Sequence, residues 1–281
     1  MAEGTTRATG RLVVVATPIG NLHDLSPRAA AALRDADLVA CEDTRRTATL
    51  LRHAGAATQM LPVHEHNEAA RAADLVRRMR EGATVALVSD AGMPGVSDPG
   101  ARVVAAAVAA AIPVSVLPGP SAVETAVVAS GLPTQPFAFV GFFPRKAGEL
   151  ATLLRRFDTW PGSVVGFESP RRVRALLQVI AAWDPARAVA VCREMTKIHE
   201  EIVRGTAPEV AERLADPVRG EITVVIGPAS APPAADDLRE ALAVLRAAGL
   251  SPARAADVAA ALGLGSRNAA YSAALASRDD R

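Results

Sequence analysis

The chain has few cysteines and no long apolar run. Its 281 residues include two cysteines, Cys41 and Cys192, which are too few for a disulfide framework and lack metal-ligand spacing. We therefore expect free thiols in a reducing compartment. The longest apolar stretch, residues 103–116, contains Pro113 and is too short to span a bilayer, and residues 1–11 contain no apolar segment typical of a signal peptide. These absences predict a soluble, cytoplasmic protein without membrane contacts.

The chain also lacks a strong net charge and the common nucleotide-binding fingerprints. Its formal net charge is +1, so any basic patch that attracts nucleic acid must be local. The turn at 17–21 is not G-x-G-x-x-G, no G-x-x-x-x-G-K-[ST] occurs, and residues 119–123 lack the second glycine of a nucleophile elbow. These gaps disfavour a dinucleotide-dependent dehydrogenase, a P-loop kinase and an α/β hydrolase. His64 and His66 have no third ligand nearby, so we expect a polar loop and no metal site.

The first half of the chain alternates apolar runs with helical patterns. Short apolar runs predict strands at 12–16, 37–41, 60–63, 85–88 and 114–117, with helices between them. This alternation is typical of a parallel α/β sheet. Before the helix expected at 101–111, Asp98 has the character of an N-cap and Pro99 that of a first helical residue.

The length allows two compact domains and a smaller appendage. We expect a flexible tail at 1–11, a parallel α/β domain at 12–117 and a second α/β domain with a mixed sheet at 118–228. Strands of the second domain are expected at 137–143, 163–167, 188–193, 200–205 and 221–226. Residues 228–236 have linker composition, and 237–281 form a helical C-terminal region of three short helices.

Polar loops follow the predicted strands of the first half. They lie at 18–21, 42–46, 64–68, 89–100 and 118–122. One such cluster is ordinary, but five on the same edge of a parallel sheet indicate a cleft, because ligands bind at the carboxyl ends of the strands. Asp90, directly after the strand at 85–88, is predicted to hold a small cofactor there.

Nine ordered motifs carry a family resemblance. They are TPIGNL(x)DL at 17–25, CEDTR at 41–45, HEHNE at 64–68, SDAGMPGVSDPG at 89–100, LPGPSA at 117–122, FVGFFPRK at 139–146, FESPRR at 167–172, REMTKIHEE at 193–201 and GEITVVIG at 220–227. The set resembles the tetrapyrrole methylase superfamily, and more narrowly its ribosomal RNA branch. The resemblance implies two α/β domains of the tetrapyrrole methylase type with a cofactor cleft between them, plus a small helical tail. It also implies methylation of the 2′-oxygen of a cytidine in the decoding region of 16S rRNA, by a homodimer.

The resemblance implies S-adenosylmethionine as the cofactor, held by backbone groups, one or two carboxylates and apolar walls. The residues carried over by motif are Pro18, Gly20, Asp90, Met93, Val96, Ser121, Ala122, Ser169 and Gly220. Glycine and proline at such positions let the main chain approach the ligand closely. The chain departs from the family pattern at Met93, where threonine is usual, and in FESPRR, where tyrosine, alanine and histidine are common.

Methyl transfer to a hydroxyl benefits from alignment and from a base. The candidates for this base, or for a lysine that tunes the hydroxyl, are Glu42, Asp43, Glu65, Glu68, Glu194 and Lys197, and the sequence does not rank them. Lys197 is one of only two lysines in the chain, although a surface ion pair is the more common role for such a residue.

Basic residues beside these motifs are the expected RNA contacts. They are Arg45, Arg46, Arg145, Lys146, Arg171 and Arg172, with Arg174 nearby. Phe142 and Phe143 have the chemistry to stack a base, but a hydrophobic strand end is the simpler interpretation.

Two other functions fit the sequence less well. The first is methylation of a tetrapyrrole in cobalamin or sirohaem synthesis, against which stand the CEDTR and HEHNE motifs of the RNA branch. The second is a non-catalytic ligand-binding regulator, against which stand complete loops on both cleft walls.

Overall fold

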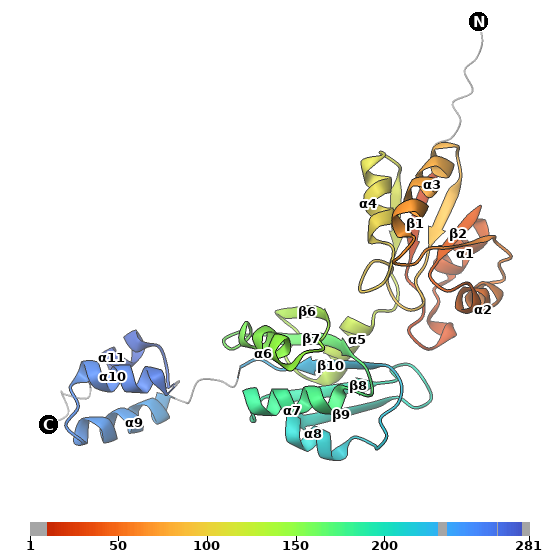
Figure 1. The fold of residues 1–281 in the computed structure, drawn as a ribbon. Coiled ribbons are helices and arrows are strands. Elements are labelled where there is room, and N and C mark those ends of the chain that lie inside the picture. The colour runs from red at the N-terminus through yellow and green to blue at the C-terminus, as the bar shows by residue number, and fades with distance from the viewer. Residues whose placement is uncertain (1–9, 230–234, 263, 277–281) are drawn as a thin grey trace, which may run out of the picture. The chain divides into compact units, whose positions relative to one another are not determined.

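The computed structural model describes residues 10–229, 235–262 and 264–276. The chain divides into two units, Met1–Phe157 with Pro161–Pro228, and Asp158–Trp160 with Ala229–Arg281. The first unit holds both β-sheets and the second holds the last three helices (Figure 1). Most of the predicted N-terminal tail and linker, at 1–9 and 230–234, lies outside the described residues. No helix in the described part of the chain is long and apolar enough to cross a membrane.

The first sheet is entirely parallel, as predicted. Its strands are β1 (Arg11–Val15), β2 (Leu38–Cys41), β3 (Met60–Pro62), β4 (Thr84–Leu87) and β5 (Val114–Leu117), in the order β3-β2-β4-β1-β5. The helices that connect them are η1 (Leu22–Asp24), α1 (Pro27–Asp35), α2 (Thr44–Ala54), α3 (Glu68–Arg80) and α4 (Ala101–Ala109). All registered pairs run parallel, so the carboxyl ends of β1, β2 and β4 meet at one edge.

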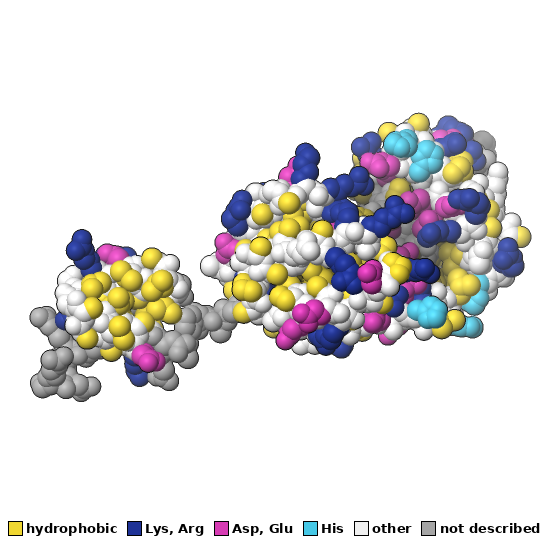
Figure 2. Space-filling view, turned by 60° about the horizontal axis from the view of Figure 1, so that its bottom comes forward, with side chains coloured by type: hydrophobic (Ala, Val, Ile, Leu, Met, Phe, Trp, Pro, Cys, Tyr) yellow, Lys and Arg dark blue, Asp and Glu magenta, His cyan; other side chains and the backbone are white. Residues whose placement is uncertain are grey.

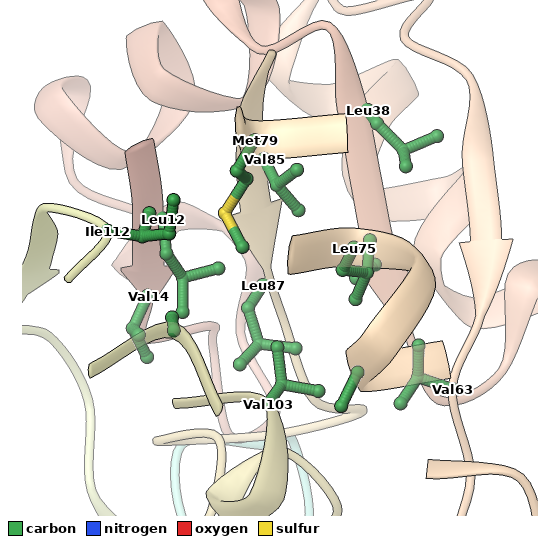
Figure 3. Close-up of a cluster of buried hydrophobic side chains, with 13 residues drawn as sticks. Leu12, Val14, Leu38, Val63, Leu75, Met79, Val85, Leu87, Val103 and Ile112 are labelled. Carbon is green, nitrogen blue, oxygen red and sulfur yellow. The ribbon is translucent and has the colours of Figure 1, made fainter. Parts of the chain in front are cut away.

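Each face of this sheet is covered by two helices. Leu12 and Val14 point to one face, where they pack with Leu75 and Met79 of α3 and Val103 of α4 (Figure 3). The intervening residues of β1 point to the other face, against α1 and α2. The three central strands, β1, β2 and β4, are buried on both sides, which explains why they read as unbroken apolar runs.

The start of α4 corrects one prediction. The helix begins at Ala101 with Gly100 as its N-cap, so Asp98 is not the cap and Pro99 is not the first helical residue. The side chain of Glu68 does the capping, because its Oε1 accepts hydrogen bonds from the N–H groups of Gly100 at 2.8 Å and Arg102 at 2.9 Å. A carboxylate at this position also offsets the positive end of the helix dipole. Asp98 is therefore available to the strand-end cleft.

The second sheet is mixed, as predicted. Its strands are β6 (Phe137–Phe142), β7 (Ser163–Glu168), β8 (Ala188–Arg193), β9 (Glu201–Thr206) and β10 (Ile222–Ile226), in the order β6-β7-β10-β8-β9. Strands β6 and β7 are parallel and the other neighbours are antiparallel. Helices α5 (Ala122–Ser130), α6 (Ala147–Arg155), α7 (Val173–Trp183) and α8 (Ala207–Arg213) complete this part. Ile19, from the turn after β1, packs into the core between α5 and this sheet, which ties the two sheets together.

Over its described residues the second unit contains three helices, as predicted for this region. They are α9 (Ala235–Ala247), α10 (Pro252–Ala261) and α11 (Arg267–Ala276). Their small core is made of Leu242 and alanines such as Ala255, Ala259 and Ala270. Alanine allows close helix contacts, so three short helices suffice to bury a common seam.

Candidate functional site

The turns after β1 and β4 are joined to each other. Thr17 and Gly92 form an antiparallel bridge, with N–H to carbonyl distances of 2.8 and 3.0 Å in the two directions. The hydroxyl of Thr17 also donates to the carbonyl of Ser89 at 3.2 Å. Gly92 has a φ of 73°, a conformation that glycine adopts without cost. The two loops that the sequence singled out therefore form one backbone platform at the edge of the sheet.

A cavity of about 380 Å³ lies beside this platform. Most of its lining comes from elements that adjoin the first sheet: the turn after β1, helix α2 and the loop after β4. Lys197 and Glu221, from loops that adjoin strands of the second sheet, complete the lining. The lining residues are Thr17, Pro18, Ile19, Gly20, Leu22, Arg46, Thr47, Thr49, Leu50, Ser89, Asp90, Ala91, Lys197 and Glu221. Its size and mixed lining are those of a small-molecule site.

Asp90 connects the loop after β4 to the start of α2. Its Oδ1 accepts the N–H of Asp43 at 3.1 Å, and its Oδ2 lies 3.4 Å from Nε of Arg46. The side chain is 22% exposed, so one side of the carboxylate remains open to the cavity. The prediction placed Asp90 at the cleft, and the structure puts it in the cavity wall.

Lys197 forms the opposite wall together with two glutamates. Its ammonium donates to Glu194 Oε1 at 2.8 Å and to Glu221 Oε2 at 2.9 Å. Burial opposes this charge, but the hydrogen bonds to Glu194 and Glu221 outweigh it, and the pKa of Lys197 is raised. The same hydrogen bond from Lys197 lowers the pKa of Glu194. Both partners are therefore charged at neutral pH.

Two glycines let the chain pack around this lysine. A Cβ on Gly20 would lie 2.6 Å from Cγ of Lys197 and 2.7 Å from Oγ1 of Thr196. Gly220 has a φ of 88°, and a Cβ there would overlap the side chain of Glu194. Glu194 and Thr196 themselves have positive φ values of 51° and 66°, which costs free energy for residues other than glycine. The loop after β8 is thus held in an unusual conformation by its ion pairs.

Asp98 is a residue whose role the sequence did not reveal. Burial is the main cause that raises the pKa of Asp98 to about 6. The negative charges of Glu42, Asp90 and Glu221 raise this pKa further, and a hydrogen bond with Ser89 lowers it. Burial also raises the pKa of Glu42. Carboxylates that follow β2 and β4 or precede β10 therefore lie close enough to Asp98 for their charges to raise its pKa. The sequence did not indicate this role of Asp98, because Ser97-Asp98-Pro99 is a pattern typical of the start of a helix.

This arrangement fits the cofactor that the resemblance implied. S-adenosylmethionine carries sulfonium and ammonium cations, a carboxylate and an adenosine, so it needs acidic, basic and apolar neighbours at once. Asp90 and Glu221 supply negative charge, Arg46 and Lys197 supply positive charge, and the turn after β1 supplies apolar surface. No phosphate cradle is needed.

Three of the nine predicted cofactor residues line this cavity, namely Pro18, Gly20 and Asp90. The other six lie outside its lining. Met93 packs partly against the first core, Val96 is exposed, and Ala122 packs against the second sheet. The hydroxyl of Ser121 is bonded to Glu124, and the N–H of Ser169 donates to Glu168 at 2.6 Å. Gly220 lies against the side chain of Glu194, which occupies the space that a Cβ at this position would need.

The catalytic candidates separate in a similar way. Lys197 lines the cavity, and Glu194 holds it in place. Asp43 caps α2 and is bound by Arg45, whose hydrogen bond lowers the pKa of Asp43 to about 2. Glu68 is buried as the cap of α4. Glu65 is an exposed residue of the loop after β3.

The basic candidates also divide into two kinds. Arg172 donates to the carbonyls of Phe143 and Pro144 at 2.9 Å and pairs with Glu168 at 2.9 Å. Arg174 likewise donates to carbonyls that follow α8 or lie in it. These two arginines are occupied by the fold. Arg45 and Arg46 pair with Asp43 and Asp90, whereas Arg145, Lys146 and Arg171 are exposed.

Basic and acidic side chains alternate over the face of the first unit shown in Figure 2. The described residues contain no group of three or more side chains placed to hold a metal ion. In the loop after β3, His64 Nε2 lies 3.0 Å from the side-chain nitrogen of Asn67.

Comparison with known proteins shows the family of the chain. A family model described as Tetrapyrrole (Corrin/Porphyrin) Methylases matches residues 11–211. Ribosomal RNA small subunit methyltransferase I of Mycobacterium tuberculosis (strain ATCC 25618 / H37Rv) is 47% identical over 229 residues, which cover 79% of this chain and 79% of that protein. The protein of the same name from Mesorhizobium japonicum is 41% identical over 271 residues, or 95% of this chain and 92% of that protein.

Solved structures share the fold. The methyltransferase CobJ has a TM-score of 0.60 at 21% identity, with 78% of this chain and 95% of that chain covered. Uroporphyrin-III C-methyl transferase from Thermus thermophilus, complexed with S-adenyl homocysteine, has a TM-score of 0.55 at 23% identity, with 78% and 97% covered. From the match over 11–211 and the identities of 41% and 47%, the chain belongs to the tetrapyrrole methylase family, in the branch whose members are named ribosomal RNA small subunit methyltransferase I.

Proposed function

We propose that the protein methylates the 2′-hydroxyl of a cytidine in the decoding region of 16S rRNA. It is a methyltransferase and its cofactor is S-adenosylmethionine, as its family membership indicates. The proposal that RNA is the substrate is supported by the 41% to 47% identity to proteins named for methylation of small-subunit ribosomal RNA. The specific nucleotide and atom rest on the resemblance of the nine motifs.

The strand-end cavity is the proposed cofactor site. Asp90 and Glu221 would face the cationic groups, Lys197 and Arg46 the carboxylate, and the turn after β1 the apolar parts. When bound, S-adenosylmethionine supplies an electrophilic methyl group. We keep Met93, Val96, Ser121, Ala122 and Ser169 as proposed contacts on the margin of this site.

The chain must align the ribose oxygen, keep water out and accept a proton. A ribose hydroxyl that received this methyl group would have to give up its proton to a group of the chain. Asp98 is the proposed acceptor, because a carboxyl group with a pKa of about 6 is ionised at neutral pH yet holds a proton better than an ordinary aspartate. Glu42, beside it, is the alternative among the sequence-derived candidates.

Exposed cations are the proposed RNA contacts. Arg145, Lys146 and Arg171 are exposed and can contact phosphates. Arg45, which pairs with Asp43, and the exposed part of Arg46, which lines the cavity beside Asp90, are the other two. We further propose that the protein acts in the cytoplasm on the small ribosomal subunit, as a homodimer that offers a larger surface to this substrate.

Mass spectrometry of methylated RNA tests the proposal. Small subunits that lack the modification are incubated with the protein and S-adenosylmethionine, and the 16S rRNA is digested and sequenced by mass. We expect one added methyl group, on the ribose of one cytidine in the decoding region. Methyl groups found only on a base, only on ribosomal protein, or on a porphyrinoid substrate but no RNA would contradict the proposal.

A further inference from the structure

Phe142 is an aromatic side chain that the fold turns outward. It ends β6, an edge strand of the second sheet, and is 62% exposed, whereas the next residue, Phe143, is 1% exposed. Between Phe139 and Phe142 the register shifts, because three steps on β6 match two steps, Val165 to Phe167, on β7. This is a β-bulge, which re-aims side chains at strand ends. Gly141 supplies it with a φ of 70°.

The ring of Phe142 packs against the ring of Phe167. It meets Phe167 edge to face, with centroids 5.5 Å apart and planes at 64°. Phe167 in turn meets Phe139 at 5.1 Å and 65°. Edge-to-face pairs are favourable beyond the area they bury and fix ring orientation. The exposed ring is therefore a supported platform, not a loose side chain.

Exposed cations lie in the two loops that adjoin this platform. Arg145 and Arg171 are exposed, and among the described residues neither has a hydrogen-bond or ion-pair partner. Lys146 is 81% exposed and pairs only with Glu149, its neighbour in the same turn. Arg172 ties the segments together, since one guanidinium binds the carbonyls after β6 and the carboxylate that ends β7. Arg145 and Arg171 therefore extend from two connected loops.

The platform also borders the loop that carries Asp98. A Cβ on Gly141 would lie 3.6 Å from the hydroxyl oxygen of Ser97, the residue before Asp98. Val96, in the same loop, is 43% exposed. An aromatic face, an apolar neighbour and free cations thus meet beside the acidic end of the strand-end site.

We propose that Phe142 stacks on an unpaired base of the substrate RNA while Arg145, Lys146 and Arg171 contact its phosphates. The proposal deepens the proposed function and rests on RNA being the substrate. Aromatic rings with nearby cations are how proteins hold splayed single-stranded RNA, and stacking on such a ring strengthens binding substantially. The occupant is RNA and not a second copy of this chain, because a two-fold symmetric contact would place these cations against themselves.

Fluorescence anisotropy with a labelled single-stranded RNA of decoding-region sequence tests the proposal. Phe142→Ala should weaken binding about 10- to 100-fold, while Phe142→Trp should retain it and show quenching of the new tryptophan by RNA. Phe137, at the other end of β6 and 38% exposed, provides the matched control, and Phe137→Ala should bind like the wild type. Replacing Arg145, Lys146 and Arg171 by alanine should lower the slope of log Kd against log salt by about 2, at about 0.7 per phosphate contact.

Three outcomes would overturn the platform. Equal RNA affinity of Phe142→Ala and Phe137→Ala is the first, and an unchanged salt slope in the triple variant is the second. The third is a change of oligomeric state in Phe142→Ala by light scattering, which would assign the ring to an interface between copies. If wild-type protein methylates small subunits in any of these cases, the proposed function stands and only the platform fails. If the wild type neither binds nor methylates RNA, the proposed function itself fails.

Discussion

The two walls of the strand-end cavity are shaped by different forces. The wall from the first sheet is set by the backbone: Thr17 and Gly92 form a bridge, and Gly95 and Gly100 have φ values of 83° and 132° that hold the loop after β4. The wall from the second sheet is set by charge, since Lys197 joins Glu194, which follows β8, to Glu221, which precedes β10.

This difference explains how one site combines precision and adaptability. A backbone wall depends on sterics and is insensitive to pH and salt. A wall of ion pairs depends on solvent and on neighbouring charges, and a charged ligand changes it directly. The wall from the first sheet should therefore tolerate changes of pH and salt better than the Lys197 wall, whose ion pairs respond to both. Both walls depend on glycine, because Gly20 and Gly220 leave the space that Lys197 and Glu194 occupy.

The largest effect is expected from a substitution in the backbone wall. In Gly100→Ala, a φ of 132° and the approach of the new Cβ to Leu87 Cδ2 at 3.2 Å and Gly95 N at 3.3 Å should lower the free energy of unfolding by about 2 to 3 kcal/mol. Urea denaturation measures it. Gly55→Ala is the control, because Gly55 has a φ of 67° but open space around it, and should cost only about 1 kcal/mol. Equal losses in both variants would show that crowding in this wall has no importance.

The second effect is a test of the charged wall. Lys197→Met leaves Glu194 and Glu221 without their shared cation, and should cost about 1 to 2 kcal/mol of stability and weaken cofactor binding about 10-fold or more. The only other lysine is the control: Lys146 is 81% exposed, and Lys146→Met should change stability by less than about 0.5 kcal/mol. Denaturation and calorimetry in low and high salt measure both. A Lys197→Met protein with wild-type cofactor affinity would contradict the role of this wall.

The third effect has opposite signs for stability and activity. Because the pKa of Asp98 is raised from 3.8 to about 6, the folded state favours its protonated form, so its charge costs stability above pH 6 and costs nothing below pH 4. Asp98→Asn should therefore stabilise the protein by about 1 to 2 kcal/mol at pH 8, a value reduced for solvent screening, and by nothing at pH 4. Thermal denaturation against pH measures this change.

The same variant should lose methyl transfer by about 10²-fold or more if Asp98 accepts the proton. In the wild type, the rate should fall as pH drops through about 6. An Asp98→Asn enzyme with the wild-type rate and the same acidic limb would assign the proton to another group, Glu42 first.

The smallest effect is expected at Glu68, which the sequence could not distinguish from a catalytic base. Glu68→Gln keeps an oxygen that accepts the N–H groups of Gly100 and Arg102, so stability should fall by less than about 1 kcal/mol and methyl transfer should persist. Glu68→Ala removes the cap and should cost more than Glu68→Gln, about 1 kcal/mol. Loss of activity in a stably folded Glu68→Gln protein would restore Glu68 as a catalytic candidate.

The sequence predicted those features that depend on local patterns. Buried strands such as β1 and β4 read directly as apolar runs, and Asp90 followed from its place at the end of one of them. It could not show that Glu68, more than thirty residues away, caps α4 and frees Asp98, because that competition is decided by tertiary contacts. It could not separate Arg172 from Arg171 either, since the difference lies in which remote carbonyls each guanidinium reaches.

The account depends most on the cofactor binding at Asp90, and calorimetric titration with S-adenosylmethionine tests it directly. Wild-type protein should bind one cofactor per chain. Asp90→Ala, checked for an unchanged circular dichroism spectrum, should bind about 100-fold more weakly or not at all. Wild-type affinity in a folded Asp90→Ala protein would contradict the assignment of the strand-end cavity as the cofactor site.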